Sequence, residues 1–296
     1  MTFGQGALIS AAAAGAGVIN AVAGGGTLLS FPALLAIGLP PVAANATNTL
    51  ALWPGQLSGV FAYRRHVAEE RRMAIFLAVP SALGGLLGSA LVLALPERTF
   101  AAAIPWLIFF ACALLAVQGP VKRWLARVHG ASHPAALWAI QLAVSIYGGY
   151  FGAGIGILML AAMGVLLPSS HQHANALKVL FSFIINAVAA VYFFGAGAAR
   201  LPEATLMAAA SMVGGFAGAR LAQRLPPAGM RWVAIGVGLY AAFLCFCRTA
   251  AMVEPSSPGF GATARPWPFM ISAFSAALSP SPSSRQRSVP ARAVLR

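Results

Sequence analysis

The sequence predicts an all-α integral membrane protein with about eight transmembrane helices in two homologous four-helix halves. Its composition is the first observation: 59% of the 296 residues are hydrophobic and 8% are charged, whereas a soluble domain carries about 25% charged residues. The second is a series of apolar runs of the length, about 20 residues, that crosses a bilayer. The third is a recurrence of glycine and proline landmarks between the two halves of the chain.

The apolar runs predict spans at residues 7–38, 42–63, 73–94, 100–118, 136–166, 171–194, 202–223 and 231–248. The first and fifth are too long for one crossing, and glycines interrupt both, at 24–26 and 152–154. Irregular backbone at membrane depth must be buried in protein or line a wet cavity. We therefore expect each half to open with a Gly-broken or re-entrant segment, whose short second helix begins near Thr27 or Ile155.

An internal repeat relates the two halves. An offset of 128 residues places Gly24 on Gly152 and Gly26 on Gly154, and an offset of 130 places Gly84 on Gly214. We assign residues 1–120 to a first transmembrane repeat, 121–130 to a basic cytoplasmic loop, 131–248 to a second transmembrane repeat and 249–296 to a Pro/Ser/Arg-rich disordered tail. Four crossings per half would give parallel repeats, and a fifth crossing at each break would give inverted repeats.

The basic residues predict an orientation in the cell inner membrane. With eight spans, one side receives Arg64, Arg65, Arg71, Arg72, Lys122, Arg123, Arg127, Arg200 and the arginines of the tail. By the positive-inside rule, this side and both termini are cytoplasmic. The net charge of +14 is thereby explained by loops and the tail, and we expect no nucleic-acid partner.

Lys178 is the principal candidate for a substrate-binding residue. It lies about seven residues into the sixth span, and an ionisable group inside a membrane usually marks a substrate or ion path. Snorkelling of its ammonium toward the headgroups is the alternative. Four further polar residues share its helical face, since the spacings are 4, 3, 4 and 4: His171, Asn175, Ser182 and Asn186. At an offset of 128 the first half has no charge on this stripe, and Leu50 corresponds to Lys178.

The glycine breaks supply the second part of the predicted site. A helix start presents free N–H groups and a positive dipole end to an anion, and glycine lets the backbone come close. The residues concerned are Gly24, Gly25, Gly26, Thr27, Gly152 and Gly154. Tight helix packing is the alternative role for these glycines, and it is the role we assign to Gly84, Gly88, Gly214 and Gly218. Thr47 and Asn48 either line the cavity or cap the second span.

Other chemistry has weaker support. His171 and His173 could bind a metal cation, but residues at i and i+2 do not share a helical face and no third ligand is apparent. The sequence has no nucleophile elbow, phosphate loop or carboxylate pair, so we expect neither an enzyme nor a cofactor. We predict a site for a small anion, without a bound metal.

Two segments resemble one family. AVAGGGTLLSFPALLAIGLPPVAANATNT at 21–49 and FGAGIGILMLAAMGVLLPSSHQHANALK at 151–178 are similar to the paired motifs of the sulfite exporter TauE/SafE family, and the resemblance covers about residues 7–248. It implies an inner-membrane exporter of small sulfur-containing anions such as sulfite or organosulfonates. The family's glycine motif falls on Gly24, Gly25 and Gly26, and its second-half Asn-Ala-Leu-Lys on Asn175 and Lys178. A permease for another solute, such as a metal cation, and a non-transporting membrane assembly factor remain alternatives, and the oligomeric state is open.

Overall fold

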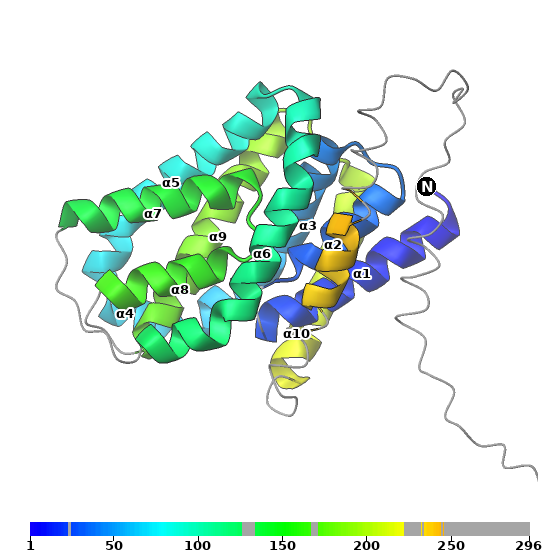
Figure 1. Ribbon diagram of the computed structural model, residues 1–296. Coiled ribbons are helices and arrows are strands. Elements are labelled where there is room, and N and C mark those ends of the chain that lie inside the picture. Colours follow the sequence, from blue (N-terminus) through cyan, green and yellow to red (C-terminus); the bar gives the residue numbers. More distant parts are fainter. Residues whose placement is uncertain are drawn as a thin grey trace, which may run out of the picture.

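A computed structural model describes residues 1–22, 25–125, 134–166, 171–221, 232, 234–243 and 245. This part of the chain is helical and contains no strand, which confirms the predicted all-α class (Figure 1). The elements in order are α1 (Phe3–Val22), α2 (Thr27–Ala36), α3 (Pro41–Ala62), α4 (Arg64–Glu69), α5 (Arg71–Ala94), α6 (Glu97–Leu125), α7 (Pro134–Tyr150), α8 (Ile155–Leu166), α9 (His171–Gly195) and α10 (Leu201–Leu221). A shorter apolar helix, Ala234–Phe243, follows. The predicted tail, 249–296, lies outside the described residues.

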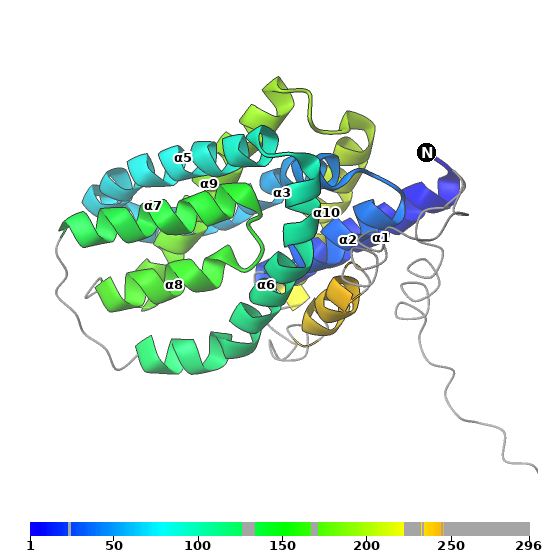
Figure 2. The same cartoon turned by 45° about the horizontal axis from the view of Figure 1, so that its top comes forward.

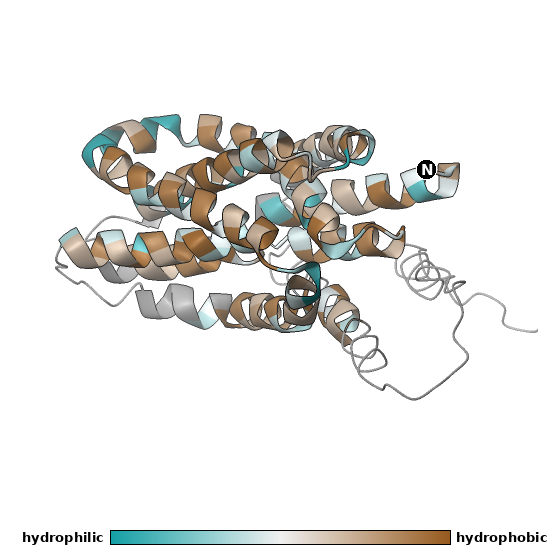
Figure 3. Cartoon of the chain, turned by 90° about the horizontal axis from the view of Figure 1, so that it is seen from above, coloured by the Kyte–Doolittle hydropathy of each residue, from teal (hydrophilic) through white to brown (hydrophobic). Residues whose placement is uncertain are grey.

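Three of these helices are long and apolar enough to cross a membrane: Arg71–Ala94, Glu97–Val117 and His173–Gly195. Large apolar side chains also lie on the outside of the molecule, where Trp106 is 68% exposed and Val213 is 70% exposed. Figure 3 shows that hydrophobic residues dominate the helices and that the most hydrophilic residues gather at helix ends. An apolar exterior of this kind is suited to lipid, so the chain is a membrane protein.

Each predicted glycine break separates a long helix from a short one that turns back along it (Figures 1 and 2). In the first break, Gly26 lies against Ala16 and Asn20, and α2 then runs back past α1 so that Leu29 reaches Gly15. The short helices α2 and α8 begin at Thr27 and Ile155, where the sequence predicted them to begin.

Two helix pairs approach each other closely through glycine. On α5, a Cβ at Gly84 would lie 2.8 Å from Leu142 O, and one at Gly88 would lie 2.6 Å from Tyr150 N, both on α7. On α10, a Cβ at Gly218 would lie 2.6 Å from Val18 Cα on α1. Small residues allow such close backbone contact between helices in membranes. These are the packing contacts that the sequence predicted for the glycines of α5 and α10.

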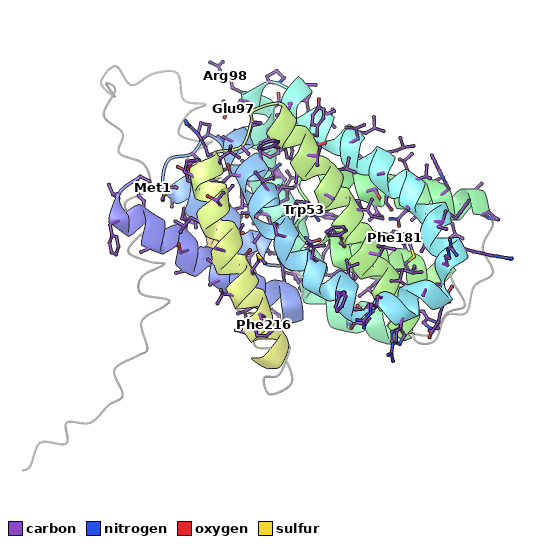
Figure 4. The ribbon with its side chains drawn as sticks, turned by 180° about the vertical axis from the view of Figure 1, so that it is seen from behind. Met1, Trp53, Glu97, Arg98, Phe181 and Phe216 are labelled. Atoms are coloured by element: carbon purple, nitrogen blue, oxygen red, sulfur yellow. The ribbon has the colours of Figure 1, made fainter. Side chains whose placement is uncertain are left out.

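Helices α3 and α9 pack against each other in opposite directions at the middle of the molecule. A Cβ at Gly59, late in α3, would lie 3.1 Å from Val179 Cγ1, early in α9. Trp53, near the middle of α3 (Figure 4), stacks on Phe183 with ring centroids 5.8 Å apart. Beyond the end of α9, Arg200 N–H donates to Thr47 Oγ1 near the start of α3, at 2.9 Å.

This arrangement corrects the predicted grouping of basic residues. Arg64 and Arg65 directly follow the end of α3, whereas Arg200 contacts its start, and α3 has 22 residues, or about 33 Å of helix. These arginines therefore lie at opposite ends of the molecule. The grouping was wrong because it counted each broken segment as one span, whereas α2 and α8 return along the helices before them. The first turn of α1 lies at the same end of the molecule as Arg200, since Gly6 is next to Leu206 in α10 and Arg200 directly precedes α10.

Replacement of Gly88 by alanine tests the close contact between α5 and α7. The new Cβ would meet backbone atoms of Ile146 and Tyr150, which cannot move aside without separating the helices. We expect a loss of about 1–3 kcal/mol of stability, measured as a lower thermal midpoint of the purified protein in detergent. Gly195→Ala is the matched control, because nothing lies within 4 Å of its ideal Cβ. Equal midpoints for the two variants would contradict the packing role.

Candidate functional site

A cavity of about 330 Å³ lies between α3 and α9 and extends to α1, α10 and both glycine breaks. Its polar lining residues are Asn20, Thr27, Asn48, Thr49, Gln56, Asn175, Lys178, Ser182, Asn186 and Ser211. Leu52, Phe151, Ile155 and Val179 add apolar surface, and glycines of α1, α3, α10 and the breaks complete the wall. The two breaks, which are far apart in the sequence, thus meet at one site.

Lys178 carries the charge of this cavity. Among the described residues that line it, no other side chain is charged at neutral pH. The aliphatic stem of Lys178 lies against the first turn of α8, where an ideal Cβ at Gly156 would be 3.4 Å from its Cδ. The stem of Lys178 thus passes close to the start of α8. A positive side chain and a positive helix end therefore share one region of the cavity.

The first break is held by side chains of its neighbours. Gly26 N–H donates to Asn20 Oδ1 at 2.8 Å, so the side chain of α1 satisfies a backbone group at the start of α2. In the first turn of α2, Ser30 Oγ donates to Asn48 Oδ1 on α3 at 2.5 Å. Since the carboxamide oxygen of Asn48 accepts this bond, its NH2 group is the part available to a ligand.

The second break depends on two left-handed glycines, Gly152 with φ 74° and Gly154 with φ 76°. Other residues rarely adopt this backbone conformation. Between them, Ala153 O accepts a 2.6 Å hydrogen bond from Tyr147 Oη of α7. Asn45 Nδ2 of α3 donates to Tyr150 O at 3.0 Å, just before the break. These contacts fix the path by which the chain enters α8.

The structure brings most of the predicted site residues to the cavity. The lining includes Lys178, Asn175, Ser182, Asn186, Gly25, Thr27, Asn48, Gly152 and Gly154. It does not include Gly26, which precedes α2 and donates to Asn20. Nor does it include Thr47, which is buried on another face of α3 and accepts the bond from Arg200. Gly24 and the side chain of His171 lie outside the described residues.

Several lining residues were not predicted from the sequence. Asn20 and Gln56 are polar residues within apolar runs, a pattern that could have indicated a cavity lining. Gln56 also shares a face of α3 with Asn48 and Leu52, at spacings of four residues. Ser211 and Gly215 reach the cavity from α10, and Gly17 reaches it from α1. Only the pairing of α1 with α10 brings these last three residues to the site, so their role could not be seen before the fold was known.

The cavity lining favours a different register for the predicted repeat. Four of its lining residues on α3, Asn48, Thr49, Leu52 and Gln56, correspond to Lys178, Val179, Ser182 and Asn186 on α9, while Gly55, Gly59 and Asn175 have no such counterpart in the lining. Each pair is separated by 130 residues, so Asn48, and not Leu50, occupies the position of Lys178. The offset is 128 at the glycines before α2 and α8 and 130 at these positions of α3 and α9, so the second half of the chain has two more residues between Gly154 and Lys178 than the first has between Gly26 and Asn48.

His173 contacts carboxylates at the start of α9. Its Nε2 lies 2.8 Å from Glu69 Oε2, and its Nδ1 lies 3.3 Å from Glu70 Oε1. The ring of His66 is also close, with centroids 5.7 Å apart. Among the described residues no group of three or more His, Cys, Asp or Glu is arranged to hold a metal ion. This cluster joins α4 to α9 and lies outside the lining of the cavity.

Comparison with known proteins finds membrane transporters among the relatives of this chain. The sequence profile of the sulfite exporter TauE/SafE family matches residues 9–244. The chain is 30% identical to "Probable membrane transporter protein" of Haemophilus influenzae, over 70% of this chain and 80% of that protein. It is also 30% identical to "Probable membrane transporter protein YfcA" of Escherichia coli K12, over 71% and 76% of the two chains. No solved structure matches the chain significantly.

Alanine at Gly152 or Gly154 tests the geometry of the second break. A Cβ in the left-handed conformation costs about 1–2 kcal/mol, so each variant should melt at a lower temperature than the wild type. Gly156→Ala is the control in the same segment, because its φ is not positive and its nearest contact is an ordinary 3.4 Å. Thermal melting in detergent measures all three. A Gly152→Ala variant as stable as Gly156→Ala would show that the break does not require the observed backbone.

Proposed function

The chain belongs to the sulfite exporter TauE/SafE family of membrane transporters, and we propose that it exports small sulfur-containing anions, such as sulfite or organosulfonates, across the bacterial inner membrane. The observation that carries this proposal is the position of Lys178. It is the charged residue in a cavity whose other described polar lining consists of hydroxyl and carboxamide groups. A cavity of this kind attracts an anion and offers it neutral hydrogen-bond donors.

The electrostatics of the cavity favour an anion of low charge. Lys178 supplies one positive charge, and the starts of α2 and α8 each add about half a charge at the helix end. The described lining contains no carboxylate, so nothing in it repels an anion. Asn175, Ser182 and Asn48 can donate hydrogen bonds to sulfonate or sulfite oxygens, and Gly25 and Gly154 let those oxygens approach the backbone.

The size and composition of the cavity suit a small organic anion. Its volume, about 330 Å³, is at the lower end of the range of about 300–1,000 Å³ for small-molecule sites. Leu52, Phe151, Ile155 and Val179 give it an apolar part. In our proposal the sulfur-bound oxygens lie by Lys178 and the carbon chain of an organosulfonate lies against these apolar side chains, while sulfite occupies only the charged part.

We also propose that the two halves are inverted repeats, with the site at their interface. Gly84 and Gly88 face Leu142 and Ile146, while Gly214 and Gly218 face Ala14 and Val18. Gly214 and Gly218 follow Gly84 and Gly88 by 130 residues, and Leu142 and Ile146 follow Ala14 and Val18 by 128. The two sets of contacts therefore correspond to each other. The opposite directions of α3 and α9 support inversion, since parallel repeats would make these two helices parallel. Transporters with inverted repeats bind substrate at the repeat interface, beside broken helices.

The inversion changes the proposed orientation. Arg64, Arg65, Arg71 and Arg72 cluster at the end of α3 and the start of α5, and by the positive-inside rule we assign this end to the cytoplasm. The start of α1 then lies on the other side, in contrast to the prediction of two cytoplasmic termini. The cavity lies toward the basic end of α3, from Asn48 to Gly59. An anion that leaves the cell from this cavity gains about 2.3 kcal/mol per charge per 100 mV.

Replacement of Lys178 tests the proposed transport. We expect Lys178→Met to lower the efflux of sulfite and ethanesulfonate from proteoliposomes at least about tenfold, because a buried anion would lose its charged partner. Lys178→Arg should retain part of the efflux. Thr205→Val, on the exposed surface of α10, is the control and should transport like the wild type.

The same assay separates the alternatives. Equal efflux for wild type and Lys178→Met would contradict the role of the lysine. A well-folded wild type that moves none of the anions would favour an assembly factor, and flux that depends on a metal cation would favour a metal permease.

The orientation is tested by labelling single cysteines. In a variant without the natural cysteines, we expect cysteine at Thr2 or Arg98 to react with a membrane-impermeant maleimide in intact cells from which the outer membrane has been permeabilised. Cysteine at Arg65 should react only in inverted inner-membrane vesicles, because it lies at the basic end. All three positions are exposed. Labelling of positions 2 and 65 from the same side would exclude this orientation.

A further inference from the structure

We propose that the pair Asn48 and Lys178 sets the number of negative charges on the substrate, with Asn48 as the specificity-determining position that limits it to one. This inference rests on the proposed function of the cavity as an anion site. It adds a role for a neutral residue in the first half of the chain. It also predicts that the charge can be moved from one half to the other.

The geometry of the two cavity walls supports the pairing. Helices α3 and α9 run in opposite directions, and four lining positions on each correspond at an offset of 130: 48, 49, 52 and 56 on α3, and 178, 179, 182 and 186 on α9. Residues at equivalent positions of two inverted helices lie symmetrically about the cavity between them. Asn48 therefore offers its side chain to the cavity from the side opposite to Lys178.

The local contacts of Asn48 show what this position supplies. The residue is 2% exposed, its oxygen accepts the bond from Ser30 Oγ, and its NH2 group remains for a ligand. A carboxamide donates a hydrogen bond without adding charge. The Asn48 end of the cavity consequently has only the dipole of the α2 start, whereas the Lys178 end has a full charge beside the start of α8, which matches an anion with a single ionised group. A second ionised group would lie at the Asn48 end without a charged side chain to pair with, and desolvating it there would be unfavourable.

Ethanesulfonate and ethane-1,2-disulfonate form the matched pair of probes, since they share a two-carbon chain and differ by one sulfonate. Binding to the purified full-length protein is measured by calorimetry at constant ionic strength. We expect the wild type to prefer ethanesulfonate. Asn48→Lys should shift the ratio of the two affinities at least about tenfold toward the disulfonate, because a second cation now faces the second sulfonate.

The exchange variant Asn48→Lys/Lys178→Asn provides the sharper test. It keeps one charge in the cavity, so it should bind ethanesulfonate within about threefold of the wild type, whereas Lys178→Asn alone should bind it weakly. The control is Leu50→Lys/Lys178→Asn, which moves the lysine to a position that does not line the cavity and should restore nothing. A folded exchange variant that binds no better than Lys178→Asn would overturn the proposal.

A further variant covers the case in which the Asn48→Lys protein does not fold. Asn48→Asp is nearly isosteric, and the added negative charge should weaken ethanesulfonate binding at least about tenfold. Unchanged binding would overturn the inference. The failure of the proposed function gives a different result, because the wild type itself would then bind neither sulfonate.

Discussion

Two interruptions of helical backbone within an apolar molecule are the constraint on which this structure depends. Backbone N–H and C=O groups without partners cost several kcal/mol each in a membrane interior, so the chain can break there only where other groups replace the lost helical bonds. Asn20 serves this purpose at the first break, and Tyr147 and Asn45 serve it at the second. These residues belong to α1, α7 and α3, which must therefore lie around the breaks. The same requirement produces a polar cavity inside an otherwise apolar bundle.

The close glycine contacts are a second condition for that cavity. Gly84 and Gly88 bring α5 against α7, and Gly214 and Gly218 bring α10 against α1. Lipid tails are as apolar as the side chains of these helices, so association depends on close packing. With the outer pairs fixed in this way, α3 and α9 are held between them, and their polar faces are directed at each other and at the breaks.

Much of this structure could be predicted from the sequence, and the parts that could not have identifiable causes. Apolar runs and glycines placed the long helices and the starts of α2 and α8 within a few residues, because composition and helix breaking are local properties. The polar stripe of α9 predicted Asn175, Lys178, Ser182 and Asn186 as one face, and all four line the cavity.

The backward course of α2 and α8 could not be predicted, since hydropathy does not record the direction of a helix. The predicted grouping of the arginines on one side was therefore wrong. Ser211 and Gly17 reach the cavity only through the pairing of α10 with α1, which is a tertiary property. The 128-residue offset paired Lys178 with Leu50 because its glycine landmarks precede α2 and α8, whereas the cavity positions of α3 and α9 differ by 130.

The change of offset from 128 at the glycine breaks to 130 at the cavity helices has a consequence for how the proposed repeats can differ. Two residues add about 3 Å to a helix and turn it by more than half a revolution. In a long spanning helix such an insertion would rotate every later side chain away from its partner. Here the two extra residues of the second half fall between Gly154 and Lys178, before most of α9, and the cavity positions of α3 and α9 keep one offset, 130. In the proposed repeats, one half can therefore gain residues ahead of its cavity helix without changing which side chains face the cavity. This segment is where natural variants of the chain should accept insertions and where a designer could lengthen one half alone to reshape the substrate cavity.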